Sequence, residues 1–191
     1  MAAPAQANRL LLDGEALRRT VARIAHEIVE RNPDLERTAL VGIHTRGVPF
    51  AQRLRREIDG FAGLEVALGT LDITFHRDDV HVRGGGAPLH PQPVVRSTRL
   101  DFPLEGVTCV LCDDVLYTGR TIRAAIDALF DYGRPARVQL AVLVDRGHRE
   151  LPIRPDYVGK NLPTSHDERI QVQLLEVDEV DRVLLVPAPG K

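Results

Sequence analysis

Two adjacent carboxylates, Asp113 and Asp114, follow a short apolar run at residues 107–111. That run is rich in β-branched and apolar side chains, so we expect a buried parallel strand that ends near Cys112. A helix is predicted over residues 122–130. The spacing therefore places an acidic pair and a polar loop on one strand-to-helix turn.

The loop between the carboxylates and the helix has the composition of a phosphate site. A helix N-terminus offers unpaired backbone N–H groups and the positive end of the helix dipole. The residues concerned are Thr118, Gly119, Arg120 and Thr121. Asp113 and Asp114 would repel phosphate, so their expected partners are neutral hydroxyls or magnesium held partly through water. A ribose 5-phosphate satisfies both parts of the turn.

A second turn, Thr45-Arg46-Gly47, follows another short predicted strand at residues 40–43. Glycine at the carboxyl end of a strand lets backbone approach a ligand closely, and the guanidinium of Arg46 suits a diphosphate. From the residues alone, an ordinary strand-to-helix turn is the simpler interpretation.

The wider sequence carries a resemblance that begins at residues 109–121. These 13 residues resemble the phosphoribosyl-diphosphate signature of type I phosphoribosyltransferases. Further segments are RIAHEIVER at 23–31, VGIHTRG at 41–47, LDIT at 71–74, LAVLVDRGHRELPIR at 140–154 and YVGKNLPTS at 157–165. They are similar to one family, the bifunctional pyrimidine operon attenuator and uracil phosphoribosyltransferases, PyrR. The similarity extends from about Leu10 to Val186.

The resemblance implies an α/β protein with the type I phosphoribosyltransferase fold, a mainly parallel sheet flanked by helices with a flexible hood loop. We expect a single domain over residues 1–191, with 76–103 as a mobile loop and 145–168 as a base-binding or hood segment. A hydrophobic content of 43% is enough for a substantial core. Several arginines of the loop are candidates to touch the diphosphate: Arg77, Arg83, Arg96 and Arg99.

The implied reaction joins uracil to 5-phosphoribosyl diphosphate, giving UMP and diphosphate, with Mg²⁺. Arg46, Asp113 and Asp114 are then the catalytic residues, and the two aspartates hold the metal indirectly, through water or ribose. The implied substrate-binding set is Thr45, Arg46, Gly47, Asp113, Asp114, Val115, Leu116, Tyr117, Thr118, Gly119, Arg120, Thr121, Asp145, Arg146, Lys160 and Asn161.

Two positions favour a pyrimidine over a 6-oxopurine. Purine-type members of the superfamily resemble this chain but commonly carry a carboxylate at the place of Tyr117 and a lysine near Asp145. An ordinary phenol stays protonated near neutrality and is a poor base. Asp145 could accept an N–H such as that of uracil N3, although pairing with Arg146, Arg149 or Arg154 remains an equal alternative.

The second implied function is RNA binding. Arg19, Arg23 and His26 recur at i, i+4 and i+7, on the helix face opposite the apolar residues. Such a stripe is also typical of a solvated surface, and the net charge of −2 gives no general attraction to nucleic acid. The resemblance implies that a dimer or higher homo-oligomer binds a stem-loop in the pyrimidine operon leader mRNA, more tightly with UMP or UTP. The candidate residues are Arg19, Arg23, His26, Arg31, Arg149, Arg154 and Lys160.

The remaining elements alternate as in an α/β sheet. We expect a helix over 15–31 capped by Asp13, a helix from the second turn to about Ile58, and a strand around 65–74. A further strand is predicted at 139–144, and 157–165 is expected to form a lid.

Cys109 and Cys112 are three residues apart on a predicted strand, so they should point to opposite faces rather than form a redox or metal pair.

No apolar run is long enough to cross a bilayer, and we expect a cytoplasmic protein without membrane contact. Two alternatives stay open, a dedicated uracil salvage enzyme without RNA binding and a type I enzyme for another base.

Overall fold

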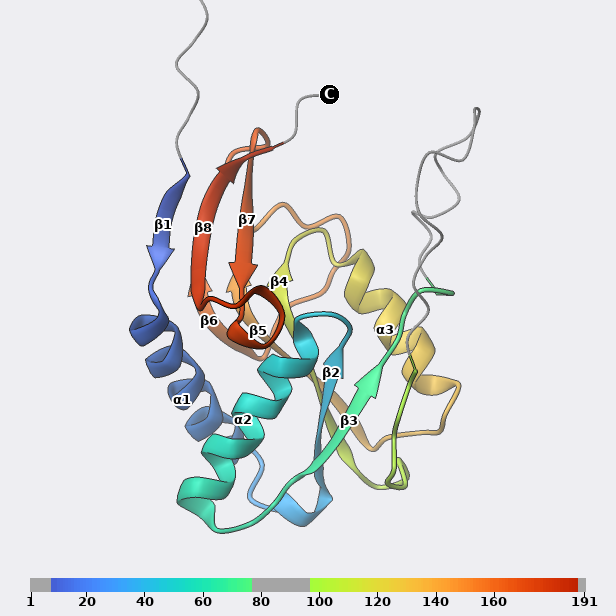
Figure 1. Cartoon of the computed structure of the whole chain (residues 1–191). Helices are drawn as coiled ribbons and strands as arrows, with labels where there is room; N and C mark the ends of the chain where they lie inside the picture. The colour runs from blue at the N-terminus through green and yellow to red at the C-terminus, as the bar shows by residue number, and fades with distance from the viewer. Residues whose placement is uncertain (1–7, 77–96, 189–191) are drawn as a thin grey trace, which may run out of the picture.

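The computed structural model describes residues 8–76 and 97–188, which form two sheets and their covering helices (Figure 1). The larger sheet has five strands in the order β3-β2-β4-β5-β6, and every neighbouring pair is parallel. Its strands are β2 Thr38–Ile43, β3 Ala67–Leu71, β4 Thr108–Leu116, β5 Arg137–Asp145 and β6 Tyr157–Asn161. The predicted parallel α/β sheet is confirmed.

Three helices cover this sheet, and they are α1 Gly14–Arg31, α2 Gly47–Ala62 and α3 Arg120–Phe130. α1 and α2 lie on one face and α3 lies on the other (Figure 1). The buried side chains divide in the same way, because Cys112 packs in the cluster under α1 and α2 while Cys109 packs in the cluster under α3. The expectation that the two cysteines point to opposite faces is confirmed.

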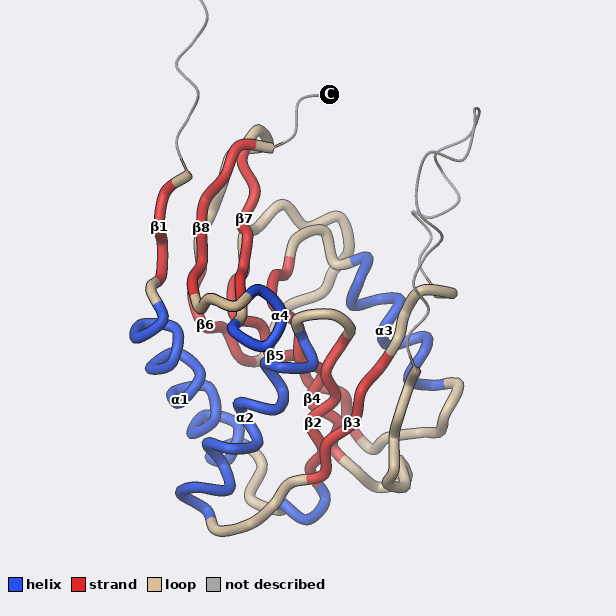
Figure 2. Tube along the Cα trace, viewed as in Figure 1, coloured by secondary structure: helices blue, strands red, loops and turns tan. Residues whose placement is uncertain are grey.

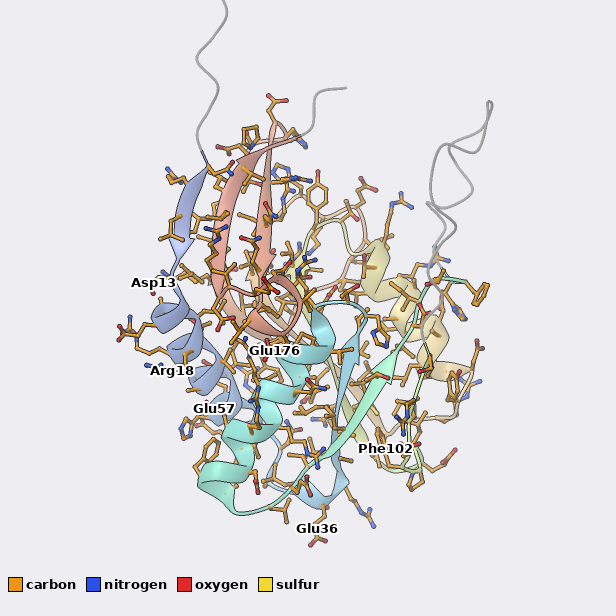
Figure 3. The ribbon with its side chains drawn as sticks, viewed as in Figure 1. Asp13, Arg18, Glu36, Glu57, Phe102 and Glu176 are labelled. Atoms are coloured by element: carbon orange, nitrogen blue, oxygen red, sulfur yellow. The ribbon has the colours of Figure 1, made fainter. Side chains whose placement is uncertain are left out.

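The N-terminus of α1 forms as the sequence predicts. Asp13 has an extended backbone and its carboxylate accepts the N–H of Ala16 at 2.8 Å, so it caps the helix (Figure 3). Most apolar residues of α1 are buried, and Leu17, Ile24 and Ile28 are fully excluded from solvent. Helix α1 therefore lies across the sheet with its charged residues facing outward.

A second, antiparallel sheet has three strands in the order β1-β8-β7. Its strands are β1 Arg9–Leu12, β7 Glu168–Gln173 and β8 Arg182–Pro187, and the short helix α4 Leu175–Asp178 joins the last two. A 3₁₀ turn, η1 Leu35–Arg37, precedes β2. Figure 2 shows this small sheet above α1 and α2, on the side where β2, β4 and β5 end. The sequence did not predict this sheet, whose outer strands come from opposite ends of the chain.

Two predicted boundaries are wrong, and both errors have the same cause. β4 continues beyond Cys112 to Leu116 because β5 pairs with it through Leu116, so the acidic pair lies within the strand. Residues 157–161 do not form a lid; they are β6, which pairs with β5, and Tyr157 is fully buried. In each case hydrogen bonding to a neighbouring strand extends a segment that looks irregular in sequence.

The order of the strands creates a switch point. From β2 the chain passes through α2 to β3 on one side, and it then returns to β4 on the other side of β2. In open α/β sheets, the crevice at such a point lies outside the carboxyl ends of the strands and commonly binds a ligand. The described helices include none that is long and apolar enough to cross a membrane.

The long segment between β3 and β4 is described only at its ends. Residues 77–96 of the predicted mobile loop lie outside the described residues, and so do Arg77, Arg83 and Arg96. Arg99 is described: its backbone pairs with Thr70, and its guanidinium lies 3.5 Å from the carboxylate of Asp101. Arg99 therefore runs along the edge strand β3 with an exposed side chain.

Candidate active site at the carboxyl ends of the parallel strands

Parallel pairing aligns the ends of three strands. Leu116 at the end of β4 is paired with Asp145 at the end of β5, and Asp145 is paired with Asn161 at the end of β6. The loop after β2 opens on the same edge of the sheet. Most of the residues that the sequence predicts for substrate binding therefore meet along this edge.

Asp113 and Asp114 lie near the end of β4 and differ in environment. The side chain of Asp113 is buried, and one of its oxygens accepts the N–H of Asp114 at 3.0 Å. Asp114 accepts the N–H of Val115 at 3.0 Å. Burial raises the pKa of the Asp114 carboxyl, and the positive charge of Arg46 opposes that rise. The pair thus presents hydrogen-bond acceptors at the switch point.

The loop after β4 leads into α3 through a glycine in a left-handed conformation. Gly119 has φ of 96° and precedes the helix without a side-chain capping hydrogen bond, which leaves N–H groups of the first turn available to an anion. The following chain supports the loop, since Glu150 and Leu151 donate their backbone N–H groups to the carbonyl of Thr118 at 3.0 and 3.1 Å. The guanidinium of Arg120 is also engaged in an ion pair, because its Nε lies 2.8 Å from Glu150 Oε2.

The turn at residues 45–47 packs directly against β4. A Cβ atom on Gly47 would lie 2.2 Å from the carbonyl oxygen of Cys112, so only glycine fits where α2 begins. The peptide bond between His44 and Thr45 is cis. This close packing brings Arg46 next to the acidic pair.

Arg46 is engaged in the structure. Its guanidinium forms two hydrogen bonds to Asp178 of α4, with Nε–Oδ2 at 3.0 Å and Nη2–Oδ1 at 2.6 Å. The hydrogen bond to Asp178 is the main reason that the pKa of Arg46 is raised. The sequence predicted that Arg46 faces a ligand; it lies at the predicted place, but its partner in this structure is a carboxylate of the same chain.

A cavity of about 250 Å³ lies beside this ion pair. Arg46 and Asp114 line it from the parallel sheet, and β7 lines it from the small sheet through Arg169, Ile170, Gln171 and Val172. The cavity thus lies between the two sheets, at the switch point, and is open to solvent. Arg169, Gln171 and Asp178 were not among the predicted site residues, although the alternation of β7 and the acidic run at 176–181 are visible in the sequence.

The segment after β5 folds back on itself. Asp145 forms an ion pair with Arg149, and its other oxygen accepts the N–H of Gly147 at 2.9 Å. Arg149 also donates to the carbonyls of Tyr117 at 2.7 Å and Ile153 at 2.9 Å. Of the alternatives for Asp145, the structure therefore shows the ion pair with Arg149, and Arg149 points inward rather than toward a surface partner.

Tyr117 is covered by its neighbours. The guanidinium of Arg146 lies 3.9 Å from the centre of the Tyr117 ring, a cation–π contact, and His148 approaches the ring edge at 5.9 Å between centroids. Arg146 is buried, donating to the carbonyl of Glu168 at 2.7 Å and to the hydroxyl of Thr164 at 3.1 Å. Burial lowers the pKa of Arg146. These contacts join the loop after β5 to the start of β7.

Two of the predicted RNA-binding residues, both on α1, contact β6 or the residue that precedes it. Arg23 of α1 donates to the carbonyls of Val158 at 2.9 Å and Gly159 at 2.7 Å on β6. Arg31 donates to the carbonyl of Asp156 at 3.0 Å. Arg23 and Arg31 are themselves exposed and so border the surface where α1 meets β6, and Arg19, His26, Arg154 and Lys160 are exposed as well. His26 stacks on Phe61 of α2 with 4.0 Å between ring centroids.

A metal held by protein groups alone is not indicated. No group of three or more His, Cys, Asp or Glu residues with metal-binding geometry occurs in the parts of the chain that the structure describes. Two adjacent carboxylates fit a different arrangement, in which magnesium keeps waters and is bound mainly through substrate phosphates.

Comparison with known proteins identifies the family. A family model described as phosphoribosyl transferase domain matches residues 9–178. "Bifunctional protein PyrR" of Roseiflexus sp. (strain RS-1) is 57% identical over 177 residues, covering 92% of this chain and 93% of the relative. The protein of the same name from Thermus aquaticus is 58% identical over 180 residues, covering 94% and 96%.

Solved structures support the same fold. A hypoxanthine phosphoribosyltransferase of Trypanosoma cruzi superposes with a TM-score of 0.68 at 18% identity, covering 95% of this chain and 97% of the other. One from Staphylococcus aureus gives 0.66 at 17% identity, covering 95% and 93%. At this identity the likeness establishes the fold alone. Together with the identity to the PyrR proteins over nearly the whole chain, these matches show that the chain belongs to the phosphoribosyltransferases and, within them, to the PyrR family.

Proposed function

We propose that this protein transfers the 5-phosphoribosyl group from 5-phosphoribosyl diphosphate to uracil and that it regulates pyrimidine biosynthesis by binding leader mRNA. In the transfer, a bond forms between N1 of uracil and C1 of ribose while the bond from C1 to the diphosphate oxygen breaks. The electron pair leaves with the diphosphate, and the N1 proton of uracil is released. The product nucleotide is UMP.

The observation that carries the enzymatic proposal is the convergence at the switch point. The uncapped N-terminus of α3 holds the 5-phosphate, and the side chains of Asp113 and Asp114 accept hydrogen bonds from the ribose hydroxyls. Arg46 lies on the opposite side of the cavity from β7, where it stabilises the charge that develops on the diphosphate. Positioning and electrostatic stabilisation account for this chemistry without a covalent nucleophile.

Mg²⁺ belongs to the proposal as a companion of the diphosphate. Asp113 and Asp114 fit it through water or through the ribose hydroxyls, since two carboxylates beside a phosphate ligand are a usual environment for this ion. When bound, the ion neutralises charge on the diphosphate. The residues of the chain still orient the ribose.

Steady-state assays test the enzyme directly. UMP formation from uracil and 5-phosphoribosyl diphosphate is measured with Mg²⁺ and with chelator, and hypoxanthine, guanine and orotate are compared as acceptors. We expect uracil to be used best. Tyr117 lies under the guanidinium of Arg146, and neither residue is a carboxylate that could act as the base for a purine ring. Preferential use of another base would refute the uracil assignment, and no transfer to any base would refute the enzyme.

The regulatory half rests on the surface where α1 meets β6. Arg23 and Arg31 bind the backbone of the 156–159 segment, so the basic residues around them are held in a fixed arrangement. Phosphate contacts from such a local patch can bind a structured RNA despite the net charge of −2. The proposed partner is a stem-loop of the pyrimidine operon leader mRNA. In a homodimer, two copies of this surface are available to the RNA. The proposed location is the cytoplasm, where the transcript is available.

Retention of a labelled leader stem-loop tests this half. Binding is compared with a scrambled hairpin at one fixed salt concentration, with and without UMP. Specific binding that tightens with UMP supports the regulator. Absence of specific binding at every UMP concentration leaves a uracil salvage enzyme.

A further inference from the structure

A second and larger cavity lies outside the candidate active site, between α1 and α2. Its volume is about 710 Å³, and it is open to solvent. It is lined by His26 of α1, by Phe61 of α2 and by Leu175 of α4, among others. A cavity of this size accommodates a heterocyclic ring with the groups attached to it. The proposed transfer reaction uses none of these side chains.

The wall of this cavity carries a stacked aromatic pair. The rings of His26 and Phe61 lie 4.0 Å apart between centroids, at an interplanar angle of 15°. His26 is exposed, and 40% of the Phe61 surface is exposed, so burial in the core does not account for the pair. Beside Phe61, a Cβ built on Gly60 would meet no atom within 4 Å, which leaves the approach open. Two nearly parallel rings at an open cavity offer a flat face on which another planar ring can stack.

The stacked pair lies at the end of the basic stripe on α1. Arg19, Arg23 and His26 recur at i, i+4 and i+7, on one face of the helix. His26 thus belongs both to this stripe and to the cavity wall. Proteins commonly recognise unpaired RNA bases by stacking them on aromatic side chains. An RNA loop whose phosphates contact the stripe would have its bases within reach of the cavity.

Two charged side chains at the cavity are available to the edge of a base. Arg18 lines it from α1 and Glu57 lines it from α2 (Figure 3). Within residues 8–76 and 97–188, neither side chain forms an ion pair or a hydrogen bond. A carboxylate accepts hydrogen bonds and a guanidinium donates them, so together they suit a base with an amino group and a ring acceptor. The other Arg, Asp and Glu residues that line the cavity are paired among themselves, and they are Arg53, Arg56, Glu176 and Asp181.

We propose that the cavity between α1 and α2 binds one unpaired base of the leader RNA, which stacks on the pair of His26 and Phe61. This inference rests on the proposed RNA-binding function. The amino group of the base donates a hydrogen bond to Glu57, and a ring acceptor of the base accepts one from Arg18. Adenine, cytosine and guanine meet both requirements, whereas uracil has no amino group. The cavity thereby supplies a base preference that phosphate contacts along the stripe do not provide.

The test compares binding of the labelled leader stem-loop, with UMP present, by the wild type and Phe61→Leu. Leucine keeps an apolar side chain at this position but removes the ring. We expect Kd to rise about tenfold, as for loss of one stack between a base and an aromatic side chain. The slope of log K against log salt should stay unchanged, because stacking neutralises no phosphate. Phe61→Tyr keeps a ring and should bind like the wild type.

Phe130→Leu is the matched control. Phe130 is 39% exposed, nearly the same as Phe61, but it ends α3 on the other face of the parallel sheet. The control should therefore bind the stem-loop like the wild type. UMP formation should be unchanged in both leucine variants, which shows that each is folded.

RNA with single missing bases locates the contact. Each unpaired base of the stem-loop is replaced in turn by an abasic nucleotide. For the wild type, one replacement should raise Kd about tenfold, and the same replacement should have no further effect on Phe61→Leu. Replacing that base by uracil should also weaken binding by the wild type.

Several outcomes would overturn the inference and leave the regulator intact. They are equal binding by the wild type and Phe61→Leu, equal loss in Phe130→Leu, and an abasic effect of the same size in the wild type and Phe61→Leu. A changed sedimentation coefficient of Phe61→Leu would also overturn it, since the cavity would then belong to a contact between copies of the chain. A wild type that binds no stem-loop at any UMP concentration would refute the regulatory function itself, and the inference with it.

Discussion

Arg46 and Asp178 form a bidentate ion pair beside the cavity, with two hydrogen bonds of 3.0 and 2.6 Å between residues 132 positions apart. Asp178 is also fixed by the backbone N–H of Leu174, which donates to it at 2.9 Å. The hydrogen bond from Arg46 lowers the pKa of the Asp178 carboxyl. A diphosphate that binds Arg46 must therefore compete with a carboxylate already in place.

Asp178→Asn should tighten the binding of 5-phosphoribosyl diphosphate. Removing the negative charge frees Arg46 for the ligand, and we expect KM for this substrate to fall about threefold to tenfold, which corresponds to a partly exposed ion pair. The measurement is KM at saturating uracil. Glu179→Gln, which removes the same charge one residue along the chain, should leave KM unchanged. A higher KM in Asp178→Asn would mean that the ion pair holds Arg46 in its active position.

Gly47→Ala should damage both stability and substrate binding. The added Cβ would lie 2.2 Å from the carbonyl oxygen of Cys112, so α2 and β4 must move apart. We expect unfolding free energy to fall by about 3 kcal/mol and KM for the diphosphate substrate to rise. Urea denaturation and steady-state assays measure the two effects.

Gly60→Ala in the same helix provides the comparison. No atom lies within 4 Å of a Cβ built there, so the substitution meets no obstacle. Alanine is the better helix former, and we expect a gain of about 0.5–1 kcal/mol. Similar effects of the two substitutions would show that close packing at Gly47 is unimportant.

Arg53→Gln should loosen the segment that contains Asp178. Arg53 of α2 binds Glu176 at 2.6 Å and Asp181 at 2.7 Å, and Glu176 can be followed in Figure 3 on the turn above α2. Loss of the guanidinium leaves Asp181 without its ion pair to Arg53 and Glu176 with only the longer contact to Arg56, at a cost of about 1–3 kcal/mol. Thermal denaturation measures it. Arg56 is an exposed neighbour whose guanidinium lies 3.3 Å from Glu176. Arg56→Gln should therefore lower the unfolding free energy by less than about 0.5 kcal/mol.

The same ion pairs give a pH dependence with a definite sign. Burial is the largest single effect on Glu176 and Asp181 and opposes their ionisation, but the hydrogen bonds and positive charge of Arg53, together with a backbone hydrogen bond to each carboxylate, outweigh it and lower the pKa of both carboxyls. A lowered folded-state pKa contributes stability in full above the ordinary carboxyl pKa of about 4, and this contribution is lost as pH falls through the lowered value. The difference in melting temperature between wild type and Arg53→Gln should therefore be largest at neutral pH and shrink toward pH 3. A difference independent of pH would assign the effect to packing.

Arg154→Gln should weaken binding of the leader stem-loop without changing catalysis. Arg154 is exposed and lies two residues before Asp156, whose carbonyl accepts a hydrogen bond from Arg31 of α1. A phosphate contact contributes to affinity regardless of sequence, so the slope of log K against log salt should fall by about 1. Arg134→Gln is the control, because Arg134 lies over Phe130 at the end of α3 and away from this surface. Equal loss of RNA binding in both variants would contradict a localised site.

Local signals in the sequence determined the parallel sheet, the capped helix and the turn between β4 and α3. Asp13 and the apolar spacing of α1 act within a few turns of chain, and the strand, acidic pair and Gly119 turn lie in one run of residues. The family resemblance added the roles that we propose for the site residues. These features are predictable because each depends on neighbours in the sequence.

Only the tertiary structure decided which side chains pair across the site. The sheet of β1, β8 and β7 joins both ends of the chain, β6 is recognisable only by its pairing with β5, and Asp178 reaches Arg46 only because α4 lies over the N-terminus of α2. Asp145 had several arginines within reach in sequence, and the folding back of its loop selected Arg149. Such contacts depend on packing between distant segments, for which a single sequence gives charges and periods but no distances.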